Sequence, residues 1–311
     1  MKFNMGKIQQ IYPKKHEFRL SEDALLWRYV PLRTLFSYIG GNIFIPSITK
    51  LQKGDPFEGG HPFKTEDFEV SLKESCGIQF DSVQKWIRTK LWTSEQKNFM
   101  NSNKNLPVLA ENYDREQYFE FLRNTRFAWC WFKSDLESDA MWKIYGKEGV
   151  AIATSVGSLS AALKSTSCDF QFGKMFYHTR RACFNTMEKQ QFVLRPHFLK
   201  RIEYIHEQEV RFVACAPKRE DGGLFFSGIK PETWIKQIRL WPGLLSQEED
   251  SLKKAIAKEL PRVPCYKSDL LQTDGRAMSR MKENWRAWAA TNASQQWKND
   301  KDGVPSILKN L

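Results

Sequence analysis

Strand-like and helix-like segments follow one another in this chain without a regular alternation. A doubly wound parallel sheet requires strands and helices to alternate, so this order predicts the α+β class with a mixed or antiparallel central sheet. We expect strands over residues 25–30, 42–47, 127–132, 149–155, 170–177, 210–216, 234–241 and 262–267. We expect helices over residues 31–38, 80–91, 115–123, 137–145, 159–164, 185–206 and 247–260, and a break near Pro196 in the helix over residues 185–206.

Three parts of the chain differ in composition. Residues 1–20 are basic and polar and predict a loose lead-in, whereas residues 21–271 carry the expected strands and predict a single α+β domain. Within that domain, residues 65–126 have mostly helical patterns, which predict an inserted group of helices that caps a cleft. The polar tail over residues 272–311 is expected to be helical and then loose.

The chain is basic and rich in aromatic residues. Its 311 residues have a formal net charge of +12, and 14% of them are aromatic, including 11 Trp. Excess positive charge favours anionic partners, so we expect nucleic acid or nucleotides to bind. Part of the excess lies between Lys174 and Arg201, where seven Lys or Arg accompany one acid. This segment predicts either a phosphate-facing surface or a solvated helix face.

Several classes of protein are excluded by what the sequence lacks. The first residues have no apolar stretch typical of a secretory signal, and no apolar run reaches the roughly 18 residues that cross a bilayer. We therefore expect a soluble cytoplasmic protein without a membrane partner. The six cysteines are scattered without metal-site spacing, so no metal is expected. Dinucleotide, phosphate-loop, serine-hydrolase and zinc-protease motifs are missing too.

Glu207, Glu209 and Arg211 form the most informative cluster of charged residues. On an extended backbone, successive side chains alternate between two faces, so these three project to one side while Val210 and Phe212 face the other. Two carboxylates and a guanidinium that line a cleft suit a cationic transition state or hydrogen bonds to a sugar. Without a cleft, the same residues are an ordinary ion-pair ladder.

Two other segments leave a structural and a functional interpretation open. Residues 55–59 predict a rigid turn. Either Asp55 only bonds to its own backbone there, or Asp55 or Glu58 is held at the mouth of a cleft. Further along, Trp142 and Tyr145 share a helix face at positions i and i+3. These two rings either pack in the core or stack on a base or a nicotinamide ring.

Three short motifs run along the chain: D-P-F-E at residues 55–58, M-W-x-x-Y at residues 141–145 and E-x-E-x-R at residues 207–211. Together with neighbouring segments they span roughly residues 25–270. In these motifs and in their order along the sequence, the chain resembles the bacterial family known as domain of unknown function 2971. The name of that family carries no activity.

Arg28 lies on an early predicted strand, Ser47 on the next and Glu209 on a late one. This order is similar to the signature of the ADP-ribosyltransferase superfamily, and Glu207 with Glu209 is similar to the E-x-E of its arginine-directed members. The resemblance implies NAD as co-substrate and a central sheet split around a cleft. It also implies that Glu209 stabilises a ribosyl cation, that Glu207 orients or deprotonates the acceptor, and that Arg28 binds NAD.

Three functions stay open at this point. The first is an NAD-consuming ADP-ribosyltransferase or NAD glycohydrolase, an effector of toxin or antiphage defence type with nucleic acid or a nucleotide as acceptor. The second is a non-catalytic module that binds nucleic acid or nucleotides, and the third is a structural partner in a defence complex. For the first function, the expected NAD-binding residues are Arg28, Tyr29, Ser47, Asp55, Trp142, Tyr145 and Arg211.

Overall fold

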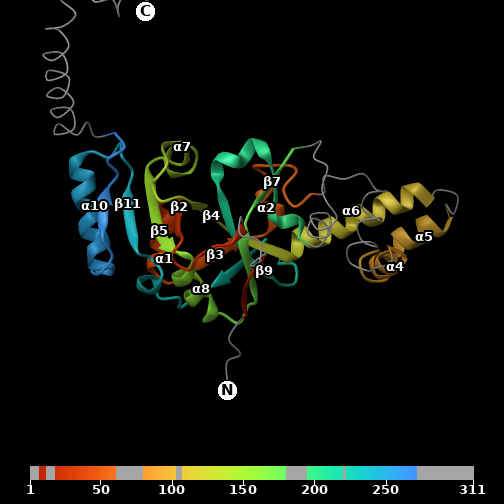
Figure 1. Cartoon of the computed structure of the whole chain (residues 1–311). Coiled ribbons are helices and arrows are strands. Elements are labelled where there is room, and N and C mark those ends of the chain that lie inside the picture. Colours follow the sequence, from red (N-terminus) through yellow and green to blue (C-terminus); the bar gives the residue numbers. More distant parts are fainter. Residues whose placement is uncertain are drawn as a thin grey trace, which may run out of the picture. The chain divides into compact units, whose positions relative to one another are not determined.

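An eight-stranded sheet with the strand order β1-β6-β9-β4-β2-β5-β11-β12 organises the chain (Figure 1). This computed structural model describes residues 7–11, 18–60, 80–102, 107–179, 195–219 and 222–271. The β1–β6 and β11–β12 pairs are parallel, and the other neighbouring pairs of this sheet are antiparallel. The prediction of an α+β protein with a mixed central sheet is therefore confirmed.

The strands are short and largely apolar. They are β1 (Ile8–Gln10), β2 (Leu25–Pro31), β3 (Ile43–Pro46), β4 (Arg126–Lys133), β5 (Gly149–Ser155), β6 (Phe170–Lys174), β7 (Phe176–His178), β8 (Leu199–Arg201), β9 (Glu209–Cys215), β10 (Gly223–Phe226), β11 (Gln237–Leu240) and β12 (Cys265–Lys267). β10 pairs with β3 in one two-stranded sheet, and β7 pairs with β8 in another.

Helices lie between the strands at irregular intervals. The α-helices are α1 (Leu32–Ile39), α2 (Ile48–Leu51), α4 (Phe80–Lys90), α5 (Ser94–Ser102), α6 (Pro107–Thr125), α7 (Asp139–Met141), α8 (Val156–Lys164) and α10 (Ser246–Glu259). The shorter turns are the π-helix η2 (Trp142–Gly146) and the 3-10 helices η3 (Pro196–Phe198), η4 (Ile202–Glu207) and η5 (Pro231–Thr233). Figure 1 shows α4, α5 and α6 as a group, within the segment predicted to be a helical insertion.

The chain divides into two compact units, Met1–Lys267 and Ser268–Leu311. The first unit contains the sheets and the helices named above. The predicted tail over residues 272–311 lies outside the described residues. In the part of the chain that the structure describes, no helix combines the length and the apolar character needed to cross a bilayer.

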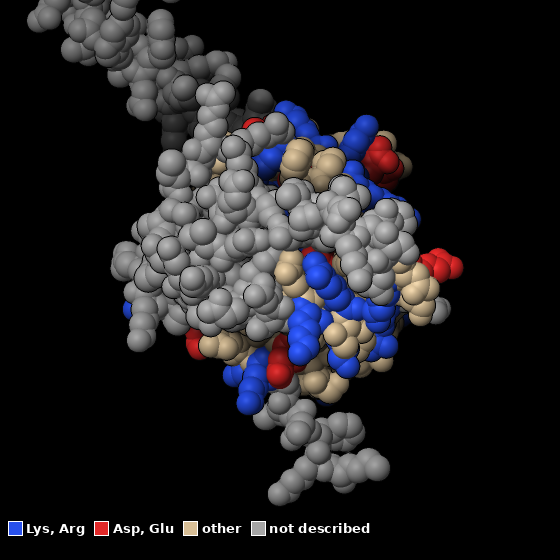
Figure 2. All heavy atoms as spheres, turned by 90° about the vertical axis from the view of Figure 1, so that its right-hand side faces the viewer, with Lys and Arg blue, Asp and Glu red and all other residues tan. Residues whose placement is uncertain are grey.

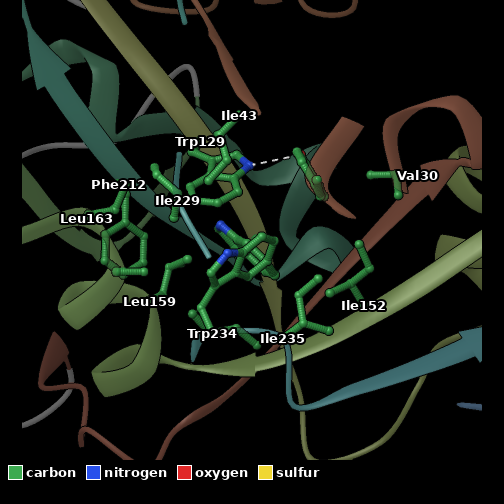
Figure 3. Packing of buried hydrophobic residues seen from close by; sticks show 14 of the residues in the cluster. Val30, Ile43, Trp129, Ile152, Leu159, Leu163, Phe212, Ile229, Trp234 and Ile235 are labelled. Atoms are coloured by element: carbon green, nitrogen blue, oxygen red, sulfur yellow. Dashed lines mark hydrogen bonds between the residues drawn. The ribbon is translucent and has the colours of Figure 1, made fainter. Parts of the chain in front are cut away.

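Large aromatic side chains fill the core on one face of the central sheet. Trp129 and Trp131, at alternate positions of β4, pack edge to face with Trp234, with ring centroids 5.1 to 6.1 Å apart. Figure 3 shows Trp129 and Trp234 among branched aliphatic side chains. Because burying one large apolar side chain contributes about 1.5–3 kcal/mol, this cluster is a major source of stability.

The central sheet changes where β2 and β4 meet. β2 pairs with β5 along its whole length, from Leu25 to Pro31, but with β4 only at Leu26 and Trp27. Beyond Trp27 the two strands part, and the Arg28 guanidinium donates a hydrogen bond to the backbone carbonyl of Cys130. Arg28 therefore satisfies a β4 carbonyl that has lost its ladder partner.

Some predictions of local structure are wrong. The helix expected over residues 185–206 is replaced, from residue 195 on, by η3, β8 and η4, while residues 185–194 lie outside the described part. β8 pairs in parallel with β7, and this tertiary pairing overrides the local helical pattern. The lead-in is not loose throughout, because β1 joins the sheet beside β6.

Candidate functional site

A cavity of about 350 Å³ is lined by residues of β2 and β4 at the point where these strands part. Its aromatic lining consists of Trp27, Tyr29, Trp131, Phe132, Tyr145 and Tyr204. Its charged lining consists of Arg28, Lys50, Asp55, Glu58, Lys200, Glu207, Glu209 and Arg211. The acidic and basic residues of this lining are equal in number. The cavity therefore has an aromatic wall and a charged wall in which the two signs of charge are present equally.

Arg211 is the centre of the charged wall and is only 1% exposed. Its two terminal nitrogens donate to the two carboxylate oxygens of Glu58 at 2.6 and 2.9 Å, and its Nε donates to Glu209 Oε1 at 2.7 Å. Arg211 and Glu209 alternate along β9, which confirms that they share a face. A buried guanidinium that two carboxylates hold in a fork geometry is rigid, since each bond restricts the next.

Lys200, on β8, joins the two glutamates of the predicted cluster. Its ammonium donates to Glu209 Oε2 at 3.0 Å and also to Glu207 Oε2. The local sequence pattern does not indicate Lys200 as a site residue, because it predicts this lysine on a helix within a basic segment. Lys200 is instead buried, and the neighbouring Arg201 bonds Asp55 at 2.8 Å.

Glu207 reaches the site by a different route from the one predicted. It is the last residue of η4 and does not belong to β9. Gln208, between η4 and β9, has a left-handed backbone with φ of 37°. The prediction of regular strand alternation from Glu207 to Arg211 is therefore wrong at its first residue. The turn nevertheless brings the Glu207 carboxylate beside that of Glu209, since both bond Lys200.

Trp142 and Tyr145 lie in different environments, one in the core and one at the cavity, although the sequence predicts that they share a helix face. Trp142 is 1% exposed, donates from Nε1 to Glu137 at 2.9 Å and packs edge to face against Tyr29, as core packing requires. Tyr145 is 46% exposed, lines the cavity and donates from its hydroxyl to Glu207 Oε1 at 2.9 Å. Because η2 is a π-helix, its wider turn changes the angle between the two side chains.

Arg28 and Tyr29 both line the cavity from β2. The Arg28 Nε donates to the Tyr38 hydroxyl at 3.2 Å, in addition to the bond from its guanidinium to Cys130. The Tyr29 hydroxyl accepts a hydrogen bond from the backbone N–H of Ser138 at 2.7 Å. The early arginine and the late glutamates thus border the same space.

Asp55 combines the two roles that the sequence left open. Its Oδ1 accepts a hydrogen bond from the backbone N–H of Phe57 at 3.1 Å, which is the expected turn. The same carboxylate bonds Arg201 and lines the cavity. The Tyr204 hydroxyl also donates to the carbonyl of Gly54 at 3.3 Å, so η4 holds this loop in place as a cavity wall.

Ser47 is not among the residues that line the cavity. It is buried, and its hydroxyl accepts a hydrogen bond from the backbone N–H of Lys50 as the N-cap of α2. Its backbone N–H donates to the carbonyl of Gly222 at 2.8 Å. These contacts give Ser47 a local structural role.

Burial and neighbouring charges shift the pKa values of several groups in the cavity. Burial alone would raise the pKa of Glu209, but the positive charges of Arg211 and Lys200 lower it well below the usual value. Burial and the nearby Glu207 carboxylate raise the pKa of the Tyr145 hydroxyl, and burial and Glu209 raise that of the Cys130 thiol. At neutral pH the site therefore holds the ionised Glu209 carboxylate beside a neutral phenol and a neutral thiol.

Among the described residues, no group of His, Cys, Asp and Glu side chains is arranged to hold a metal ion. The acids of the cavity are bound by Lys200, Arg201 and Arg211 instead. No family model, curated protein or solved structure matches the chain. The two resemblances drawn from the sequence therefore stay predictions.

Proposed function

We propose that this protein breaks the nicotinamide–ribose bond of NAD, as an ADP-ribosyltransferase or an NAD glycohydrolase. One observation carries the proposal: Arg28 of an early strand and Glu207 and Glu209 of a late segment border one cavity that also has aromatic walls. The parting of β2 and β4 beside Arg28 supports a sheet split around a cleft, the arrangement that the superfamily resemblance implies.

Glu207 suits the role of the carboxylate that meets the substrate better than Glu209 does. An ionised carboxylate can accept about four hydrogen bonds. Glu209 accepts from Arg211 Nε, from an Arg211 terminal nitrogen and from Lys200, and it also bonds the Cys130 thiol. Within the described residues, Glu207 accepts from Tyr145 and Lys200 alone, which leaves positions for a ribose hydroxyl.

The chemistry needs a negative charge beside the sugar. When the bond between nicotinamide and ribose C1′ breaks, its electron pair goes to the nicotinamide nitrogen, and the ribosyl group becomes cationic. Glu207 would offset that charge, and water or an acceptor would then bond to C1′ and release its proton. The aromatic wall suits the nicotinamide ring, and the cationic side chain of Lys50, an exposed residue of the lining, suits the diphosphate.

Release of free nicotinamide from NAD tests this proposal. We expect Glu207→Gln to lower the rate about 100-fold or more, because an electrostatic contact to the transition state is lost. Glu203→Gln is the matched control, since Glu203 is exposed on the same 3-10 helix. A wild-type protein that releases no nicotinamide, with water or with nucleic acid as acceptor, would show that the proposal is wrong.

A second candidate, binding of single-stranded nucleic acid, is favoured by a stack of side chains near the cavity. The Arg201 guanidinium lies over the rings of Phe57 and Tyr204, at 4.7 and 5.3 Å, and Phe57 is 56% exposed. Figure 2 shows Lys and Arg side chains lying together on the described part of one face. Aromatic and basic side chains of this kind stack bases and bind phosphates. Salt-sensitive binding without nicotinamide release would support this alternative.

A further inference from the structure

Lys200 occupies an unusual position between two like charges. Its ammonium donates to Oε2 of both Glu207 and Glu209, and its side chain is 8% exposed. The two carboxylate oxygens are consequently no further apart than two hydrogen bonds to one nitrogen allow. Two carboxylates that close repel each other, and the usual result is that one of them takes up a proton.

The surrounding groups do not replace Lys200 at Glu207. Besides Lys200, the titratable or charged groups that line the cavity with this pair or act on it are Arg28, Tyr29, Lys50, Asp55, Glu58, Cys130, Tyr145, Tyr177, Tyr204 and Arg211. Arg211 bonds Glu209 and Glu58. Tyr145 donates to Glu207 but brings no positive charge. Of the cations in the described part of the chain, Lys200 is the one bonded to Glu207.

We propose that Lys200 is a positioning residue that keeps Glu207 and Glu209 ionised together and holds Glu207 in the orientation used for catalysis. The ionisation part of this inference stands on the geometry alone, whereas the catalytic part rests on the proposed function. Lys200 does not touch the reacting bond. It acts through Glu207, which it binds at Oε2 and leaves Oε1 directed to Tyr145.

The electrostatics of the site agree with this role. Burial would lower the pKa of the Lys200 ammonium, but the carboxylates of Glu209, Glu58 and Glu207 raise it above the usual value. A lysine in this environment stays charged over the whole range in which the carboxylates titrate. Its positive charge is then a fixed part of the site rather than a switch.

Carboxyl titration in the full-length chain tests the ionisation part without NAD. Selective ¹³C labelling of glutamate, with Glu207→Gln and Glu209→Gln for assignment, reports each pKa by NMR. We expect the Glu209 carboxylate not to titrate between about pH 5 and pH 9 in the wild-type protein. In Lys200→Met, the pKa of one of the two glutamates should rise by about 1–3 pH units, and Lys200→Arg should restore the wild-type titration. Lys253→Met is the matched control, because Lys253 pairs with Glu249 on α10.

Each outcome decides the inference. If folded Lys200→Met keeps both carboxylates ionised over this range, the inference is wrong. If Lys200→Met does not fold, recovery of folding in Lys200→Met with Glu209→Gln supports repulsion between the acids, and no recovery overturns it.

The pH profile of nicotinamide release tests the catalytic part. In Lys200→Met, we expect the acid limb of this profile to move to higher pH together with the measured pKa, and an unchanged limb overturns that part. A wild-type protein that titrates as expected but releases no nicotinamide contradicts the proposed function and leaves the ionisation role of Lys200 intact.

Discussion

The two faces of β9 are stabilised in opposite ways. Val210, Phe212 and Ala214 face the apolar core, where stability comes from surface removed from water. Glu209 and Arg211 face the cavity, where each buried charge needs a partner because desolvation penalises it. Replacing a buried ion pair by apolar residues is often neutral or stabilising. A charged face beside a cavity is therefore evidence of a function other than stability.

Removal of Arg211 should produce the largest effect on the charged face. Arg211→Met leaves Glu58 and Glu209 buried without their guanidinium, so we expect the free energy of unfolding to fall by about 3–5 kcal/mol. Urea unfolding followed by circular dichroism measures this loss. A loss below about 1 kcal/mol would show that the network is solvated in solution.

A matched pair of variants sharpens the contrast between the two faces. Adding Glu58→Gln and Glu209→Gln to Arg211→Met removes the stranded charges and should recover a large part of the lost stability. On the core face, Trp129→Ala should lower the free energy of unfolding by about 3–5 kcal/mol, because the removed side chain leaves a cavity. No change of charge should rescue that variant, since the loss there is one of apolar packing.

His197 provides a test of the charged side as pH changes. It is buried, neither ring nitrogen has a hydrogen-bond partner among the described residues, and its carbonyl accepts from Arg211 at 2.8 Å. Burial, together with Arg126, Arg211 and Arg195, lowers its pKa well below 6.5. The unfolded chain then binds a proton below about pH 6.5 that the folded protein does not, so the protein loses stability as pH falls.

The expected contribution of His197 is about 1.4 kcal/mol per pH unit below that point. His197→Leu should remove this part of the slope in unfolding experiments at pH 7.5, 6.5 and 5.5, values chosen at roughly unit steps around the usual histidine pKa. If the free energy of unfolding has the same pH dependence in both proteins, the folded protein also binds a proton at the His197 ring, and the prediction is wrong.

Ser47 should give the smallest effect. Because its hydroxyl caps α2, we expect Ser47→Ala to lower the free energy of unfolding by about 0.5–1 kcal/mol. Nicotinamide release per folded molecule should stay unchanged, in contrast to Glu207→Gln. A large loss of activity in a stable Ser47→Ala protein would restore the role that the superfamily resemblance implies for this residue.

Much of the secondary structure follows from local pattern. The strands β4, β5 and β9 and the helices α1 and α10 lie within a few residues of their predicted bounds. Their apolar residues repeat at the period of a strand or a helix, and this period depends on near neighbours. The segment from residue 195 to Glu207 could not be predicted in this way, because β8 forms only through pairing with β7.

The sequence by itself determined the α+β class and the common face of Glu209 and Arg211, because both depend on short-range periodicity. Tertiary structure alone decided which partners neutralise that face. Glu58 meets Arg211 across 153 positions of the chain, and Tyr145 meets Glu207 across 62. Lys200 reaches both glutamates only because β8 carries it to the site and the left-handed turn at Gln208 brings Glu207 beside Glu209. Contacts of this range depend on how distant strands pack, which no local pattern specifies.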